Sequence, residues 1–105
     1  MVQDAVRKLC ATTKQLTDDL DESQLAIAVR HLDDLVHPLS GDDICALMSM
    51  LPEDGDTACG LNWTILHAIE ASPVWPIWDL LQNERHEWVD IFRVRLSNAG
   101  IAPPS

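Results

Sequence analysis

The large aromatic side chains of this chain are confined to one stretch, residues 61–100. That stretch holds all four tryptophans and the only phenylalanine, which are Trp63, Trp75, Trp78, Trp88 and Phe92. Burying one such side chain removes roughly 150–250 Å² from water, which favours folding by about 4–6 kcal/mol before the cost of ordering the chain. We therefore expect residues 61–100 to be the core-forming half, against which the aromatic-free residues 1–60 pack.

Apolar residues recur at steps of three and four, the spacing of one helix face, and predict three helices before residue 60. Their stripes are Val2, Val6, Leu9, Thr13 and Leu16; Leu25, Ala28 or Val29, Leu32, and Leu35 or Val36; and Ile44, Leu47, Met48 and Leu51. We expect Ser23 to cap the second helix and Pro38 to end it, because the residue before a proline is disfavoured in a helix. Ser40 and Asp43 resemble a capping box for the third helix, which Pro52 ends.

Residues 61–100 predict three more helices. The first runs from about Leu61 to Ala71, the second is short and ends near Gln82, and Asn83 caps the third. The third has the stripe Trp88, Ile91, Phe92 and Leu96 (or Arg95) and ends at Gly100 as a C-cap glycine. The start of the short helix stays open, because Ser72-Pro73 can begin a helix whereas Pro76 biases Trp75 toward an extended backbone.

Short helices with short connections, and no alternating strand pattern, predict an all-α fold. We expect a compact single domain of about five to six short antiparallel helices over residues 1–101, with a C-terminal tail at 102–105. The helices form either a bundle or a stack of αα-hairpins.

The charge of the chain is strongly acidic and unevenly placed. It has 17 acidic and 7 basic residues, a net charge of −10, and residues 18–60 contain eleven of the acids and only one basic residue, Arg30. Nucleic-acid binders need basic surface, so direct binding to DNA or RNA is not expected. A basic protein partner is favoured, although a role in solubility alone explains the same composition.

The acids of the connecting segments are the candidate partner contacts. Asp33 and Asp34 stand out, because they lie near a predicted helix C-terminus, where negative charge is unfavourable. Acids at helix starts, such as Asp42 and Asp43, also have a purely structural explanation in the helix dipole. The full candidate set is Asp18, Asp19, Asp33, Asp34, Asp42, Asp43, Glu53, Asp54, Asp56 and, as an aromatic anchor, Trp75.

Trp75 joins this set because it lies between two prolines in the sequence Pro73-Val74-Trp75-Pro76. An exposed tryptophan on a rigid loop is a good interface anchor. The alternative is that Trp75 folds back and covers the core. Trp63, Trp78 and Trp88 fit apolar helix faces, and we expect them in the core.

No catalytic, cofactor or metal site is expected. His67 and Glu70 share a helix face, but the pattern lacks the second half of a metal or acid–base site, and we expect His67 to be a structural histidine. Cys10 and Cys45 lie in or beside apolar stripes and are expected to be buried. Cys59 follows the acidic turn 53–56, where negative charge raises a thiol pKa and weakens the nucleophile. We therefore expect a protein that is not an enzyme.

The chain is expected to be soluble and cytoplasmic. Its first ten residues lack the order of a signal peptide, and no apolar run approaches the length of a membrane span. Its three cysteines are an odd number without a CxxC pair, which suits a reducing compartment.

The segment from Trp63 to Glu70, followed by Pro73 and Trp75-Pro76, resembles small helical immunity proteins of bacterial contact-dependent inhibition and polymorphic toxin systems. A small, acidic, all-helical chain is also similar to the immunity proteins against colicin nucleases. This chain has no tyrosine, so the Asp-Ser-Tyr-Tyr binding motif of that family is missing and no binding residues are carried over.

The resemblance implies a cytoplasmic immunity protein, monomeric when free, that binds and neutralises a cognate toxin. A basic, nuclease-type toxin domain fits the acidic charge best. The alternative is an acidic helical adaptor, or a nucleic-acid mimic, that binds another basic protein.

Overall fold

Five α-helices and one 3₁₀ helix make up the computed structural model, which describes residues 2–83 and 85–103. They are α1 (Asp4–Thr12), α2 (Glu22–Asp33), α3 (Gly41–Met48), α4 (Leu61–Glu70), the 3₁₀ helix η1 (Trp78–Leu81) and α5 (Glu87–Asn98). The described residues contain no β-strand. The predicted all-α class and the predicted number of short helices are confirmed. Pro104 and Ser105, the end of the predicted tail, lie outside the described residues.

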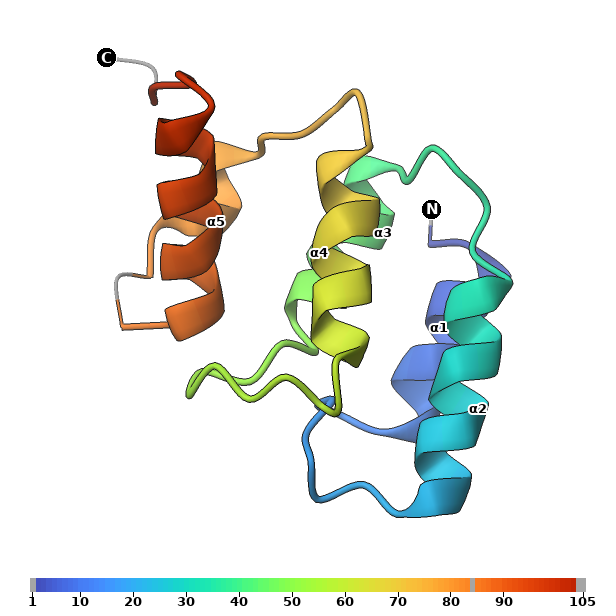
Figure 1. Ribbon diagram of the computed structural model, residues 1–105. Helices are drawn as coiled ribbons and strands as arrows, with labels where there is room; N and C mark the ends of the chain where they lie inside the picture. The colour runs from blue at the N-terminus through green and yellow to red at the C-terminus, as the bar shows by residue number, and fades with distance from the viewer. Residues whose placement is uncertain (1, 84, 104–105) are drawn as a thin grey trace.

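Successive helical segments run in alternating directions (Figure 1). α1 packs most closely on α2, and η1 packs on α5. α3 and α4 lie between these two pairs in the view and contact α1 and α2 respectively. As a consequence, α2, α4 and α5 all begin at the same side of the molecule, the lower side in Figure 1.

The core draws on both halves of the chain. Trp88 and Phe92 are fully buried, together with Ile65, Leu66 and Ile69 of α4. However, seven of the twelve largest fully buried side chains come from residues 1–60: Leu9, Leu16, Leu39, Ile44, Leu47, Met50 and Leu51. Aliphatic residues therefore contribute as much to the core as the aromatic stretch does, and residues 61–100 alone are not the core-forming half.

Local signals set most helix boundaries. The predicted capping box of α3 is present: Ser40 Oγ accepts from the Asp43 N–H, and Asp43 Oδ2 accepts from the Ser40 N–H. At the other end of the chain, the N–H of Ile101 donates to the Leu96 carbonyl at 2.9 Å. Gly100 takes a φ of +78°, which completes the predicted glycine C-cap of α5.

Two predicted caps are wrong. α2 is capped by Asp21 rather than Ser23, because Asp21 and Gln24 form a reciprocal capping box with bonds of 2.8 and 3.1 Å. α5 is capped by His86 rather than Asn83, whose Oδ1 instead accepts from the Arg85 N–H.

Three helices are shorter than their apolar stripes predict. α1 ends at Thr12, so Leu16 is buried from the loop that follows, where its N–H donates to the Met50 carbonyl at 2.9 Å. α2 ends at Asp33, before Leu35, Val36 and Pro38. α3 ends at Met48, before the buried Leu51 and Pro52. After α1 and α3 the loops continue to bury apolar residues without helical backbone, whereas Val36, after α2, is exposed.

Candidate functional site

Two acidic loops, residues 13–20 and 53–60, are tied together by their own carboxylates. The N–H of Asp18 donates to both carboxylate oxygens of Asp56 at 3.1 Å. In return, Asp18 Oδ1 accepts from the N–H of Cys59 at 2.7 Å. Asp56 Oδ1 also accepts from the N–H of Ala58 at 2.8 Å. Two of the predicted partner contacts therefore hold the loops in place.

These carboxylates stabilise an unusual turn. Ala58, Cys59 and Gly60 have φ values of +50°, +55° and +94°, so the chain stays left-handed for three residues just before α4. In this left-handed region, a residue with a Cβ is destabilised by about 1 kcal/mol or more. Asp18 and Asp56 offset part of that cost, because charged acceptors form stronger hydrogen bonds to N–H groups than neutral ones do.

The charge state of the turn follows from the same contacts. Hydrogen bonds from the Ala58 and Asp18 N–H groups lower the pKa of Asp56. Local desolvation and then the Asp18 carboxylate raise the pKa of the Cys59 thiol. The predicted effect of the acids on the pKa of Cys59 is confirmed, and a raised pKa leaves less of the thiol in the nucleophilic thiolate form.

Asn62, in the first turn of α4, anchors both loops. Its side chain is fully buried, and its Nδ2 donates to the carbonyls of Leu16 at 3.0 Å and Asp56 at 2.8 Å. The Asp56 carbonyl also accepts from Trp88 Nε1 at 2.9 Å. Asn62 is not among the predicted site residues, although it precedes Ile65, Leu66 and Ile69 at the three- and four-residue spacing of the buried face.

The acids gather on one side of the molecule, where the two loops lie and where α2, α4 and α5 begin (Figure 1). The Glu87 N–H donates to the Glu53 carbonyl at 2.9 Å, which joins the start of α5 to the 53–60 loop. We call this side the acidic side. Among the described residues, the acids of the two loops and of the starts of α2 and α5 are Asp18, Asp19, Asp21, Glu22, Glu53, Asp54, Asp56, Glu87 and Asp90, and the basic residues there are Lys14 and Arg85.

The remaining predicted acids do not join this surface. Asp33, Asp34 and Asp42 lie where α2 ends and α3 begins, at the opposite side of the molecule (Figure 1). The ten predicted residues therefore do not form one continuous site. Conversely, Asp21, Glu22, Glu87 and Asp90 belong to the acidic side although they were not predicted as contacts.

Asp43 is removed from the candidate set. It is only 3% exposed, and besides capping α3 it accepts from the backbone N–H and from Nε2 of Gln3 at 2.8 and 2.9 Å. Desolvation opposes the charge, but the hydrogen bonds from Gln3 and Ser40 outweigh it and lower the pKa of Asp43. The Asp43 carboxylate therefore connects the N-terminal segment to α3, and it is not accessible to a partner.

The structure covers Trp75, the candidate anchor, and exposes Trp63, which was expected in the core. Trp75 is half-buried and packs against Phe92 with ring centroids 4.9 Å apart, as in the alternative interpretation. Trp63, expected in the core, is 38% exposed. Its ring meets that of the buried Trp88 edge to face, with centroids 5.0 Å apart and planes inclined at 72°. The exposed aromatic candidate is therefore Trp63.

The cysteines and His67 also differ from expectation. Cys10 and Cys45 are exposed rather than buried, although Cys10 Sγ lies 3.6 Å from Sδ of the buried Met50. His67 is exposed as well, with its Nδ1 3.7 Å from Glu70 Oε1. Glu70 in turn accepts two hydrogen bonds from Arg95, at 2.7 and 2.9 Å, which bridge α4 to α5.

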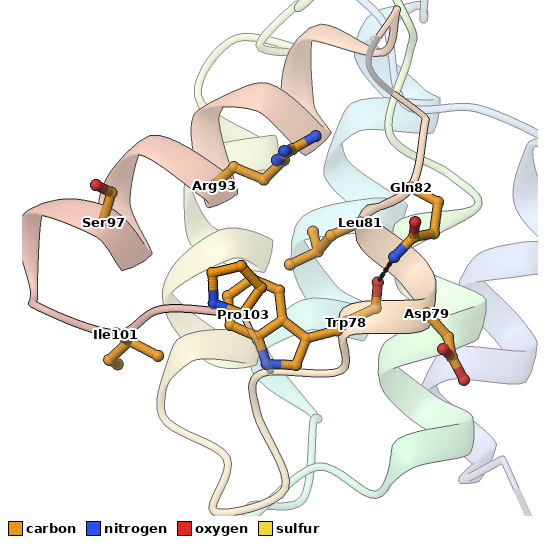
Figure 2. Close-up of a pocket in the computed structure, with 8 residues that line it drawn as sticks. All are labelled: Trp78, Asp79, Leu81, Gln82, Arg93, Ser97, Ile101 and Pro103. Carbon is orange, nitrogen blue, oxygen red and sulfur yellow. Dashed lines mark hydrogen bonds between the residues drawn. The ribbon is translucent and has the colours of Figure 1, made fainter. Parts of the chain in front are cut away.

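A hollow of about 560 Å³ lies between η1, α5 and the C-terminal segment (Figure 2). Trp78 forms part of its wall, and Gln82 Nε2 donates to the Trp78 carbonyl at 2.8 Å. Its hydroxyl, on Ser97, and its carboxylate, on Asp79, lie at opposite ends in Figure 2. Nucleophilic catalysis needs a base within hydrogen-bond reach of the hydroxyl. The carboxylate of Asp79 is too far from the hydroxyl of Ser97 to serve as that base.

Over residues 2–83 and 85–103, no three histidine, cysteine or carboxylate side chains converge as a metal site would require. None of the helices there is long and apolar enough to cross a lipid bilayer.

Comparison of the chain with protein-family models, curated proteins and solved structures finds no match.

Proposed function

We propose that this protein is a non-catalytic immunity protein that binds and neutralises a basic, nuclease-type toxin domain in the cytoplasm. The observation that carries the proposal is the acidic side, where the described loops and helix starts contain nine acidic and two basic residues. The resemblance of residues 63–76 to immunity proteins points the same way.

Charge complementarity explains how such a protein would inhibit. A nuclease holds phosphates with lysine and arginine, so an acidic protein can occupy or mask the same surface. Opposite potentials also accelerate the encounter between the two proteins. Inhibition of this kind is stoichiometric and needs no catalytic residue on the inhibitor.

The loops of the acidic side are suited to binding because they are held in one conformation. Asp18, Asp56, Asn62 and Trp88 fix the loop backbones through the hydrogen bonds described above. A surface that is already ordered loses less conformational entropy on binding. Asp19, Glu53 and Asp54 project from this framework as exposed acids.

Co-expression with the toxin domain encoded by a neighbouring gene tests the proposal. We expect rescue from toxicity, co-purification as a one-to-one complex, and an association rate that falls steeply with salt. An association rate that does not change between low and high salt would contradict the role of the acids.

A pair of charge-matched variants locates the binding surface. Asp19→Lys with Glu53→Lys reverses two acids whose carboxylates take no part in the bonds that join the loops. Asp33→Lys with Asp34→Lys makes the same charge change on the opposite side. We expect the first variant to slow association at least tenfold and the second to slow it much less. Equal effects would favour a solubility or adaptor role of the overall charge.

A further inference from the structure

Trp63 is the most exposed tryptophan among the four, and its ring is held in place. It lies in the first turn of α4, immediately after the left-handed turn 58–60. Its edge-to-face contact is with Trp88, which is fully buried and is itself bonded to the Asp56 carbonyl. An indole that is 38% exposed and packed in this way presents a rigid aromatic surface to solvent.

Two acidic residues, Glu87 and Asp56, belong to the segments that contact Trp88, the partner of this indole. Glu87 precedes Trp88 in the sequence and packs on the 53–60 loop, so closely that a Cβ at Gly55 would lie 2.5 Å from Glu87 Oε2. Asp56 lies in the same loop, joined to Trp88 through its carbonyl. Trp63 therefore lies at the part of the acidic side where α4, α5 and the 53–60 loop meet.

An aromatic face beside carboxylates has a specific complement, the guanidinium group of arginine. A guanidinium is planar, so it stacks on an indole while its edge donates hydrogen bonds to a carboxylate. A lysine ammonium makes the charge contact but lacks the planar fork. Tryptophan and arginine are also the residues most enriched among interface hot spots.

We infer that Trp63 binds an arginine side chain of the basic partner, with Glu87 as the neighbouring carboxylate. This inference rests on the proposed function, because it specifies which residue of a basic protein the acidic side selects. It predicts that the surface discriminates arginine from lysine at equal charge. Without Trp63, the acids respond to charge alone.

Two peptides of equal length and charge test this discrimination, alternating arginine–glycine and lysine–glycine decamers. Their binding is followed by NMR of the four indole N–H signals, assigned with single Trp→Phe variants. We expect the arginine peptide to bind about two- to fivefold more tightly, the preference that an exposed cation–π contact provides. The Trp63 signal should shift most and the Trp88 signal less.

Two variants complete the test. Trp63→Leu is expected to remove the arginine preference while leaving salt-dependent binding of both peptides. Glu87→Gln is expected to reduce the arginine preference. Trp78→Leu, in the hollow between η1 and α5, is the matched control and should keep the preference. Thermal unfolding of each variant shows that it is folded.

The outcomes separate the two proposals. Equal binding of the two peptides, or an unchanged preference in Trp63→Leu, would overturn the inference about Trp63. The proposed acidic binding surface would still stand if both peptides bound in a salt-dependent way. If neither peptide bound, the inference and the proposed function would both be contradicted.

Discussion

At the scale of single residues, buried polar groups connect segments that are far apart in the sequence. Asn62 joins α4 to the carbonyls of Leu16 and Asp56, and Asp43 joins α3 to Gln3 near the N-terminus. A buried polar side chain is costly unless its partners are present, so each of these groups stabilises only one arrangement of its neighbours. Such groups fix where the loops lie.

Replacing Asn62 by leucine should destabilise the fold. The variant loses two hydrogen bonds and leaves the Leu16 carbonyl without its partner, so we expect a loss of about 2–4 kcal/mol in the free energy of unfolding. Urea unfolding followed by tryptophan fluorescence measures it. Thr64→Ala, at an exposed position of the same helix, should change stability by less than about 0.5 kcal/mol. A loss for Asn62→Leu as small as that of the control would contradict the anchoring role.

Asp43 should make stability depend on pH. Because folding lowers the pKa of Asp43, its ionised form stabilises the folded state above the unfolded pKa of about 3.9. That contribution is lost as the pH falls below about 4 and through the folded pKa.

Comparison of wild type with Asp43→Asn measures this contribution. At pH 7 the variant should be less stable, and the difference in the free energy of unfolding should shrink as the pH approaches about 3. Asp33→Asn removes an equal charge from an exposed helix end and serves as the control. A difference that stays constant from pH 7 to about 3 would show that the Asp43 carboxylate is not stabilised by folding.

At the scale of the elements, helix ends depend on residues outside the helices. α5 begins at His86, whose Nδ1 accepts from the Val89 N–H at 3.4 Å while its Nε2 lies 3.0 Å from the Leu51 carbonyl. A neutral ring with its proton on Nε2 satisfies both contacts. His86 thus caps α5 and also attaches its first turn to the segment that follows α3.

Substitution of His86 separates these two roles. We expect His86→Ala to lower the free energy of unfolding by about 1–2 kcal/mol, through loss of the cap and of the bond to Leu51. His86→Asn should recover part of this loss, because asparagine is a strong N-cap. Amide exchange in the first turn of α5 reports the cap directly. His67→Ala, at an exposed position of α4, is the control, and equal losses at both histidines would contradict the assignment.

At the scale of the whole molecule, charge opposes folding. The chain carries a net charge of −10, and the excess of acidic over basic residues on the acidic side means that this side repels itself in the folded state. The hydrogen bonds of Asp18 and Asp56 hold two of these carboxylates close together despite the repulsion. Binding of a basic partner would relieve it.

Salt should therefore stabilise the free protein. Raising NaCl from about 0.01 to 0.5 M shortens the screening length from about 30 Å to a few Å. We expect the free energy of unfolding to rise by about 0.5–1 kcal/mol, the sum of a few exposed like-charge repulsions. The variant with Asp19→Lys and Glu53→Lys should show a smaller rise. Destabilisation by salt would mean that attractive ion pairs dominate the surface.

Much of the fold could be predicted because its signals are local. The Ser40–Asp43 capping box, the start of α4 at Leu61 and the cap at Gly100 depend on residues within one or two turns. The Asp21–Gln24 box is equally local, so the sequence also contains the signal for Asp21, rather than Ser23, as the cap of α2. Helix lengths were overestimated because an apolar stripe continues into buried loops, as at Leu16 and Leu51.

The candidate site was less predictable, because exposure depends on how distant segments pack. Trp75 covers Phe92 once η1 folds back on α5, whereas Trp63 stays exposed because Trp88 takes the buried position beside it. Asp18 and Asp56 are 38 residues apart, so nothing in their local sequence shows that they hold each other's loops.

The sequence by itself determined the all-α class, the order of the helices and the excess of acid between residues 18 and 60, since these depend on residue spacing and composition. Only the tertiary structure decided which acids face together and which tryptophan is exposed. The physical reason is that helix direction places loops 13–20 and 53–60 with the start of α5, and sends Asp33, Asp34 and Asp42 to the opposite side. Long-range hydrogen bonds from Asn62 and Trp88 then hold that arrangement.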